Sequence, residues 1–581
     1  KDNWQTHFKD TMRGGKFLNN WRMAELHARE APDRVWELET YGALFDRTKD
    51  GRISQRNFGG HTYPRLAHVG DRTGLELIRT MQQKIVSLQQ EDFAETGDYE
   101  ARIKVFAECT ITELLKEGDR ISGAFGYWRE SGRFILFDAP AIVLATGGIG
   151  KSFKVTSNSW EYTGDGHALA LRAGATLINM EFVQFHPTGM VWPPSVKGIL
   201  VTEGVRGDGG VLKNSEGDRF MFTYIPPVFK GQYAESEDEA DQWLKDNDSA
   251  RRTPDLLPRD EVARAINSEV KAGRGTPHGG VFLDIASRLP SDEIMRRLPS
   301  MHHQFKELAD VDITKEAMEV GPTCHYVMGG IEVDPDTGAA TVPGLFAAGE
   351  CSGGMHGSNR LGGNSLSDLL VFGRRAGLGA AEYVGSLAAR PAISQDDIDS
   401  AARAALSPFD PVDDGAENPY TLHTELQQSM NDLVGIIRTD EEIKQAIEKL
   451  DGLAARMTKV TVEGHRQFNP GWHLALDLYN MLLVSECVAK AALLRTESRG
   501  GHTRDDYPAM EAEWRNKLLV CAIDRSAGSD PLPRVSVTPE DQIPMRDDLL
   551  ALFDLTEVEK YYTGGELVSH PENSRNGKGQ P

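Results

Sequence analysis

Asn359-Arg360-Leu361-Gly362-Gly363-Asn364-Ser365-Leu366 is the stretch that decides the fold of this 581-residue chain. It follows Gly344-Leu345-Phe346-Ala347-Ala348-Gly349-Glu350 after a short glycine-rich loop. One guanidinium among glycines, behind a buried-strand pattern that ends in Gly-Glu, suits a place where backbone approaches a cofactor and a cation holds an anion. The two segments together therefore predict a ligand-facing strand end.

A second strand end of the same kind lies earlier in the chain. The apolar run Ala141 to Ala145 passes into Thr146-Gly147-Gly148, as in a strand that is buried on both faces and presents backbone to a ligand. Taken singly, each of these motifs is equally well read as an ordinary buried strand before a glycine turn. The pair, with Thr163-Gly164-Asp165-Gly166-His167 between its members, favours a Rossmann-like α/β domain.

Composition sets the outer limits of the interpretation. The chain is too long for a single core, so two to four domains are expected. Its net charge of -23 argues against nucleic acid or anionic lipid as a general partner. None of the five cysteines forms a Cys-x-x-Cys pair, so no zinc or iron–sulfur site is expected, and a reducing compartment fits. The apolar segment 474–494 is interrupted by charges and reads as a packed helix rather than a membrane span.

Periodicity gives a coarse order of elements. Residues 1–56 and 72–89 read as helical, 103–115 as a strand, and 121–128 with 134–137 as a hairpin. The acidic segment 235–248 is expected to be a solvated loop or a short helix. Short strands and glycines return over 321–406, residues 421–519 read as a helical bundle, and the tail from Pro531 has a last dozen residues that look disordered.

Together these motifs resemble the flavoprotein subunit of succinate dehydrogenase and fumarate reductase. The resemblance implies an α/β Rossmann-like FAD-binding domain with an inserted α+β capping domain, followed by a helical bundle domain and a C-terminal tail. The implied boundaries are 1–185 and 321–410 for the two parts of the FAD-binding domain, 186–320 for the capping domain, 411–530 for the helical domain and 531–581 for the tail.

The chain departs from the family pattern at its start. The family opens with a strand, a G-x-G-x-x-G turn and a helix that bind the FAD pyrophosphate, and no such fingerprint is present here. A β–α unit with its connection needs about 50–60 residues, which are expected to be missing before Lys1. Members of the respiratory type carry a histidine bonded covalently to the flavin, and covalent attachment of FAD is not assignable in this chain.

The resemblance also implies the residues that hold the cofactor. Glu350 resembles the acidic residue that faces FAD hydroxyls, where one carboxylate can accept two hydrogen bonds. The full implied cofactor-binding set is Ala145, Thr146, Gly147, Gly148, Asp165, Glu350, Ser365 and Leu366.

The chemistry is implied by a second group of residues. His186, Thr202, His325 and Arg360 match dicarboxylate-binding positions, and Glu203 and Arg206 match a proton-relay pair. A structural histidine and a local ion pair are the bland alternatives. The resemblance puts Arg264 at the catalytic position, in the same cleft as Arg360. On the expected helix, however, Arg264 points ~200° from Val262 and Ile266, and a surface arginine is the commoner fate.

The implied function is succinate oxidation by hydride transfer to FAD, in respiratory complex II and the tricarboxylic acid cycle. Implied partners are an iron–sulfur subunit, membrane anchor subunits and, indirectly, quinone, at the cytoplasmic face of a bacterial inner membrane. Fumarate reductase uses the same residues in the opposite direction. Further alternatives are L-aspartate oxidase and a non-catalytic docking subunit, which aspartate oxidation by the isolated chain or a colourless protein would support.

Overall fold

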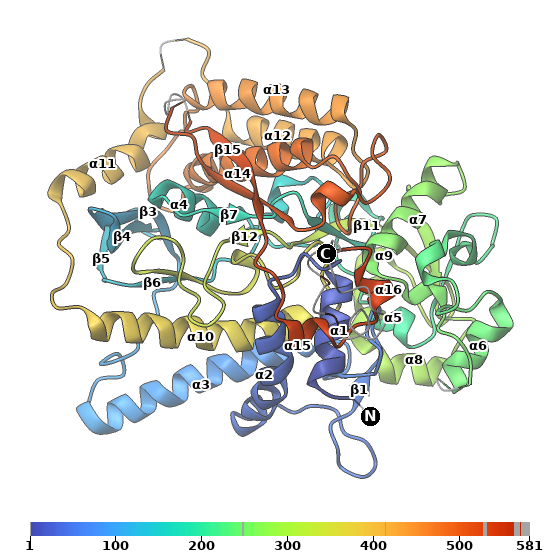
Figure 1. Cartoon of the computed structure of the whole chain (residues 1–581). Helices are drawn as coiled ribbons and strands as arrows, with labels where there is room; N and C mark the ends of the chain where they lie inside the picture. The colour runs from blue at the N-terminus through green and yellow to red at the C-terminus, as the bar shows by residue number, and fades with distance from the viewer. Residues whose placement is uncertain are drawn as a thin grey trace.

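The computed structural model describes residues 2–246, 249–412, 414–526, 532–562, 567 and 570. Several small sheets lie between helices in a mixed α/β arrangement (Figure 1). A helical group made of α12, α13 and α14 lies along one side in Figure 1, and the elements α5 to α9 lie together at another. The fold class expected from the sequence is confirmed.

The two strand ends expected to face a ligand are neighbours in one parallel pair. Strand β6 (Ile142–Leu144) runs beside β13 (Leu345–Ala347), with Val143 opposite Phe346. The expectation that the first strand is buried on both faces is wrong, because the Val143 side chain is 39% exposed. In the part of the chain that the structure describes, β6 and β13 form a two-stranded sheet, so β6 is an edge strand.

A long helix follows the Arg360 stretch, in a segment where the sequence interpretation expected short strands and glycines. Helix α10 (Asn364–Ser386) starts directly behind Gly363, whose φ of 88° is in the left-handed region that favours glycine. It packs on α2 (Trp21–Thr40) and on β13. The first residues of α10 are thereby held at the end of the parallel pair.

Residues 532–562 of the segment expected as a tail are an ordered part of the fold. Strand β15 (Val535–Asp541) pairs with β14 (Lys517–Ile523). Beyond it, α15 (Asp547–Leu550) and α16 (Leu555–Val558) lie beside α1 (Trp4–Gly14), as the red and dark blue ribbons of Figure 1 show. Aromatic stacking fixes this contact, with the rings of Phe17 and Tyr561 4.6 Å apart. Of the last dozen residues, expected to be disordered, all but His570 lie outside the described residues.

The capping domain is built on an antiparallel sheet in the order β8-β11-β10-β9. Its strands are β8 (Val183–Met190), β9 (Val211–Lys213), β10 (Val281–Asp284) and β11 (Met318–Val327). Its helices are α5 (Gly204–Gly207), α6 (Glu237–Lys245), α7 (Arg259–Lys271), α8 (Ser291–Arg297) and α9 (Pro299–Ala309). The acidic segment forms α6 with Ser236 as its N-cap, which confirms the short helix; Asn247 and Asp248 lie outside the described residues.

The helical domain packs α12 (Pro419–Leu433) and α13 (Asp440–Met457) against α14 (Pro470–Leu494). Helix α14 is buried along most of its length. Of the helices in the described part of the chain, none has the length and apolarity to cross a membrane.

The remaining elements are α3 (Thr73–Thr96), α4 (Asp165–Ala173), α11 (Gln395–Leu406), β1 (Gln55–Arg56), β2 (Leu66–Ala67), β3 (Cys109–Glu117), β4 (Arg120–Trp128), β5 (Phe134–Asp138), β7 (Leu177–Ile178) and β12 (Gly330–Ile331).

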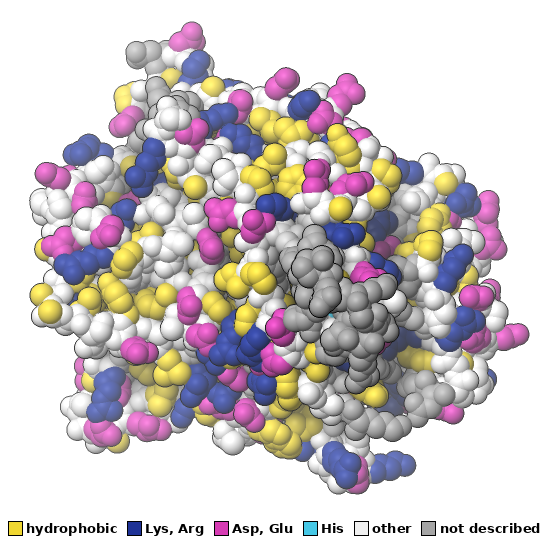
Figure 2. Space-filling view, in the orientation of Figure 1, with side chains coloured by type: hydrophobic (Ala, Val, Ile, Leu, Met, Phe, Trp, Pro, Cys, Tyr) yellow, Lys and Arg dark blue, Asp and Glu magenta, His cyan; other side chains and the backbone are white. Residues whose placement is uncertain are grey.

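Side chains of opposite charge lie close together on the surface. Figure 2 shows acidic and basic side chains interspersed over one face, with Lys and Arg gathered below its centre, where α2 and α10 lie in Figure 1. Apolar exposure is concentrated on α3, whose Leu75 and Ile78 are 65% and 58% exposed. The helical period expected for this segment is confirmed.

Candidate active site

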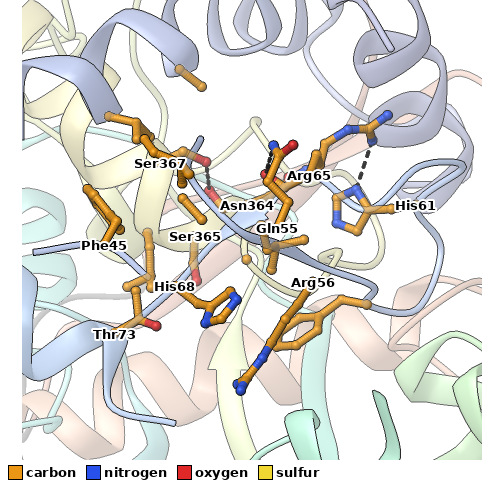
Figure 3. A pocket seen from close by; sticks show the side chains of 18 of the residues that line it. Phe45, Gln55, Arg56, His61, Arg65, His68, Thr73, Asn364, Ser365 and Ser367 are labelled. Atoms are coloured by element: carbon orange, nitrogen blue, oxygen red, sulfur yellow. Dashed lines mark hydrogen bonds between the residues drawn. The ribbon is translucent and has the colours of Figure 1, made fainter. Parts of the chain in front are cut away.

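A cavity of about 1140 Å³ opens where the start of α10, the β1–β2 hairpin and the capping domain meet. Figure 3 shows Arg56, His61 and His68 reaching into it from the hairpin, near Asn364 and Ser365 of α10. Five of the residues expected to bind substrate or relay protons line it: His186, Thr202, Glu203, His325 and Arg360. The structure therefore gathers all four residues of the dicarboxylate set in one place, from β8, β11, the segment before α5 and the Arg360 loop.

Two of the guanidinium groups that line this cavity, those of Arg259 and Arg360, share one amide. Arg360 donates from Nη2 to Oε1 of Gln184 at 3.0 Å, and Arg259 donates from Nη1 to the same oxygen at 3.4 Å. The Nε2 amide of Gln184 donates to the Arg360 carbonyl at 2.7 Å and to Asn359 Oδ1 at 2.8 Å. Gln184 is buried and uses both donors and its acceptor oxygen. It therefore fixes the separation of two like charges without adding a countercharge.

Burial and mutual repulsion act on these cations. Arg360 is 3% exposed, and burial together with the charge of Arg259 lowers its pKa to about 10. Its Nη1 donates to Ser365 Oγ at 2.6 Å, its guanidinium carbon lies 4.3 Å from the ring centre of Tyr326, and its Nε has no partner among the described residues. A buried cation with an unused donor is a site for an anion.

Glu203 is the carboxylate that accompanies the arginines. Its Oε2 accepts from Arg259 Nε at 2.8 Å, its Oε1 accepts from Gly59 N at 2.8 Å, and Arg206 Nη2 lies 3.9 Å away. Burial opposes ionisation, but the charges of Arg259 and Arg206 outweigh it and lower the pKa of Glu203 to about 2. The three side chains form a continuous charged chain from the cavity into the capping domain.

Two neutral histidines complete the lining. The rings of His186 and His325 are 5.3 Å apart, and burial plus the nearby arginines lowers the pKa of both well below 6.5. Nε2 of His186 lies 2.9 Å from the Val201 carbonyl, and its Nδ1 has no partner among the described residues. Nδ1 of His325 lies 2.8 Å from Ser157 Oγ. Each ring thus has one nitrogen fixed by the protein.

The N-terminus of α10 forms another wall. Residues 363–367 all line the cavity, so the partial positive charge of the helix start faces it. His61 supports this wall: its Nε2 lies 2.8 Å from the Gly362 carbonyl and its Nδ1 lies 2.9 Å from Arg65 Nη1, a contact drawn in Figure 3. Ser365 and Leu366, expected to contact the cofactor, are at this helix start.

Arg264 is not in the cavity, and the expectation that it shares a cleft with Arg360 is wrong. Its guanidinium donates instead to the Gly500 carbonyl and to Thr503 Oγ1, at 3.3 and 3.0 Å. The physical reason is the helical period, which turns the Arg264 side chain away from the buried stripe of α7. Arg206 also lies outside the lining and reaches the cavity through Glu203.

Arg259 is the guanidinium that the sequence interpretation missed. It follows Pro258 at the first position of α7. At ~100° per residue it points ~60° from Val262 and ~20° from Ile266, so the period that excluded Arg264 would have selected it. Gln184 and Ser157 were missed as well, and nothing in their local sequence signals an amide or hydroxyl that contacts a site.

The remaining expected cofactor residues gather at the end of the parallel strand pair, outside the cavity lining. A Cβ at Gly148 would lie 2.1 Å from Glu350 Oε1, and Thr146 Oγ1 lies 3.3 Å from Cys351 Sγ. Ala145 directly follows β6 and Gly147 lies against Tyr162, which a Cβ there would approach to 3.1 Å. Burial raises the pKa of Glu350 to about 8.

Asp165, also expected to bind the cofactor, contacts the helical domain instead. Its carboxylate accepts from Asn480 Nδ2 at 2.8 Å and Thr163 Oγ1 at 3.0 Å. It is therefore part of the contact between α4 and the helical domain, and burial raises its pKa.

Comparison with known families matches two regions of the chain. Residues 1–366 match the "FAD binding domain" model, and residues 423–544 match the "Fumarate reductase flavoprotein C-term" model. The chain is 42% identical over 520 residues to a fumarate reductase (CoM/CoB) protein of Methanothermobacter marburgensis, covering 90% of this chain and 86% of that one. It is 37% identical over 529 residues to the succinate dehydrogenase flavoprotein subunit of Coxiella burnetii, covering 87% and 83%.

Solved structures agree with the sequence matches. The chain is 72% identical to a protein chain of Mycobacterium smegmatis Sdh1 in complex with UQ1, with a TM-score of 0.85 and coverage of 98% of this chain and 90% of that one. A quinol–fumarate reductase with menaquinol molecules is 32% identical, with a TM-score of 0.82 and coverage of 94% and 89%.

Proposed function

We propose that this chain, which belongs to the family of succinate dehydrogenase and fumarate reductase flavoprotein subunits, is the catalytic subunit of an FAD-dependent succinate dehydrogenase. It oxidises succinate to fumarate. The observation that carries the assignment is the pair of guanidinium groups, Arg259 and Arg360, facing one cavity and held by the single amide of Gln184.

The residues present fit FAD. The cavity is of the size that encloses a cofactor fragment together with a small substrate. The positive end of α10 at Ser365 and Leu366 suits the electron-rich edge of a flavin ring, and the close approach of Gly148 to Glu350 leaves no space for a side chain between them. Bound FAD supplies the acceptor for the hydride.

Succinate is a dianion, so each carboxylate needs its own donors. Arg360, with its unused Nε, and His325 are placed to hold one. Thr202 and His186 are placed to hold the other; the Thr202 hydroxyl accepts from Gly204 N at 3.2 Å, which leaves its proton to donate. Holding both ends fixes the central carbon–carbon bond and turns oxidation into an oriented step within one complex.

Proton transfer follows the chain Arg259, Glu203, Arg206. An arginine is an awkward base because its pKa exceeds ~12, so Arg259 can take a proton from substrate carbon only while it passes one on to Glu203. Glu203, with a pKa of about 2, holds that proton briefly and returns to its ionised form as the proton passes on toward solvent by way of Arg206. In the direction of fumarate reduction, Arg259 is a ready proton donor, so the alternative direction uses the same residues.

The electrons must leave the chain for another protein. Because none of its five cysteines forms a Cys-x-x-Cys pair, the thiolates of an iron–sulfur cluster come from a partner protein. We propose membrane anchor subunits that react with quinone, together with an iron–sulfur subunit, in a complex at the cytoplasmic face of a bacterial inner membrane. The quinone of the complex sets the physiological direction.

Succinate-dependent reduction of an artificial dye by the assembled complex tests the assignment. Activity that malonate inhibits competitively is the expected result. Oxidation of aspartate by oxygen in the isolated flavoprotein, without succinate activity, would favour an L-aspartate oxidase instead.

A further inference from the structure

One short loop of the helical domain contacts both segments that carry the cavity arginines. The loop is Gly500–Thr503, between α14 and β14. It accepts hydrogen bonds from Arg264, five residues after Arg259 on α7. It also donates from Gly501 N to the Ser358 carbonyl at 2.8 Å, two residues before Arg360. The spacing of the two arginines is thus tied to a third part of the molecule.

The contact made by Arg264 has the geometry of an interdomain clamp. One nitrogen, Nη1, donates to the Gly500 carbonyl and to Thr503 Oγ1, while Nη2 pairs with Asp260 at 3.4 Å and with Glu261 at 2.7 Å. The side chain is 25% exposed, so these charge-assisted bonds are only partly screened by solvent. The planar fork of arginine serves both domains at once in a fixed geometry that the single ammonium of a lysine reproduces only in part.

A further hydrogen bond joins α7 directly to the Arg360 stretch, so that α7, this stretch and the Gly500–Thr503 loop each contact the other two. Asp260, beside Arg259, accepts at Oδ1 from Asn359 Nδ2 at 2.8 Å. Asn359 precedes Arg360 and follows Ser358, which the loop holds. The loop fits closely, since Gly500 has a φ of 54° and a Cβ there would lie 2.4 Å from the Ser358 carbonyl oxygen.

The loop itself is anchored by buried charges. Arg495 and Arg499 both pair with Glu497, at 3.0 and 2.8 Å, and all three side chains are fully buried. His502 Nδ1 lies 2.8 Å from Arg438 Nη1. Breaking a buried charge network is costly, so the loop is a fixed reference against which α7 is held.

We propose that Arg264 is a positioning residue that latches α7, and with it Arg259, onto the Gly500–Thr503 loop. Its catalytic consequence rests on the proposed function, because Arg259 then acts on the substrate. Without the latch, α7 moves relative to Arg360, and the state that holds both carboxylates is less populated.

The test measures hydrogen–deuterium exchange of the holoenzyme without dicarboxylate, which does not depend on activity. Arg264→Gln is expected to speed exchange in the peptides of α7 by about tenfold, to change the anchored 499–503 loop much less, and to leave α13 unchanged. Thr503→Val is expected to give part of the effect. The double variant is expected to fall short of the sum, because both substitutions remove one contact.

The matched control is Arg296→Gln, which removes an exposed ion pair with Glu293 in the same domain and is expected to change neither exchange nor kinetics. In steady-state assays, Arg264→Gln is expected to raise the KM for succinate about fivefold, lower kcat less, and leave flavin content intact, with partial rescue in Arg264→Lys. Unchanged exchange in α7, or equally faster exchange throughout the protein, would overturn the latch. Faster exchange in α7 in an enzyme inactive toward succinate would keep the latch and remove the proposed function.

Discussion

Nε of Arg259 lies 2.8 Å from Oε2 of Glu203, and Nη1 of the same guanidinium lies 3.4 Å from Oε1 of Gln184. One side chain thus connects the carboxylate of the proposed proton path with the amide that holds Arg360. The two arginines of α7 lie in different places: Arg259 lies at the cavity, and Arg264 lies at the contact with the helical domain.

Replacing Arg259 by glutamine should nearly abolish succinate oxidation. The substitution removes the cavity guanidinium that pairs with Glu203, and loss of a positioned acid–base group costs about 10²–10⁴ in rate. The measurement is kcat with succinate, with flavin content checked by absorbance. Lys271→Gln, at the exposed far end of the same helix, is the control and should retain full activity. Arg259→Gln activity close to that of the wild type would remove Arg259 from the chemistry.

Replacing Gln184 by glutamate should weaken dicarboxylate binding. The new carboxylate would lie within 3.4 Å of both guanidinium groups and would neutralise part of the positive charge that attracts the substrate. We expect the Kd for malonate to rise about tenfold or more, which corresponds to roughly 1.4 kcal/mol. The flavin spectrum reports binding by titration. Tighter malonate binding in this variant would mean that Gln184 does not organise the anion site.

Glu350 should make the protein less stable as pH rises. Burial raises its folded-state pKa to about 8 from an ordinary value of 4.5, so between those values the unfolded chain has released a proton that the native state keeps. Stability from this group is therefore complete below about pH 4.5 and is lost progressively up to about pH 8.

The variant Glu350→Gln keeps the acceptor for Val327 N and removes the titration. Its melting temperature relative to the wild type, measured on flavin-free protein, should rise through this pH range. A difference that is independent of pH would show that Glu350 is already ionised in the native protein.

Gly148→Ala should lower both stability and flavin content. Its Cβ would lie 2.1 Å from the Glu350 carboxylate, and relieving such a clash costs about 1–3 kcal/mol. Gly373→Ala in α10 is the matched control, because a Cβ there meets no atom within 4 Å and alanine favours a helix. Chemical denaturation and flavin absorbance of the purified proteins check both changes. Equal stability of the two variants would contradict the close packing at the strand end.

Much of the architecture follows from patterns along the sequence. The strand ends before Gly147 and Gly349 are recognisable as a pair, because two apolar runs that each stop at glycine flank the Gly-Asp-Gly stretch at 164–166, as in a Rossmann-like domain. The helices predicted from the periodicity of α3 and α7 are present in the structure. The periodicity does not show whether other residues cover the apolar face of a helix: Leu75 and Ile78 lie on a regular apolar stripe that is exposed.

The sequence placed the residues proposed to bind the dicarboxylate and the proposed relay pair Glu203 and Arg206, but it missed Arg259, the arginine proposed to face the substrate carbon. His186, Thr202, His325 and Arg360 lie within motifs that the family resemblance identified, and the structure places them in one cavity. Choosing between Arg259 and Arg264 required knowing toward which side of α7 each side chain points. The helical period puts Arg259, and not Arg264, on the buried side. Gln184 could not be found in this way, since its role depends on the meeting of β8, α7 and the Arg360 loop.

The central claim is that Arg259 and Arg360 hold a dicarboxylate in one flavin-containing cavity. Its most direct test is an anaerobic titration of the purified holoenzyme with succinate, followed by the visible absorbance of the flavin. The account predicts that succinate bleaches the flavin of the wild type, and that neither Arg259→Gln nor Arg360→Gln is bleached at the same concentration while both keep their flavin. A wild-type flavin that succinate leaves oxidised, or equal bleaching in all three proteins, would contradict it.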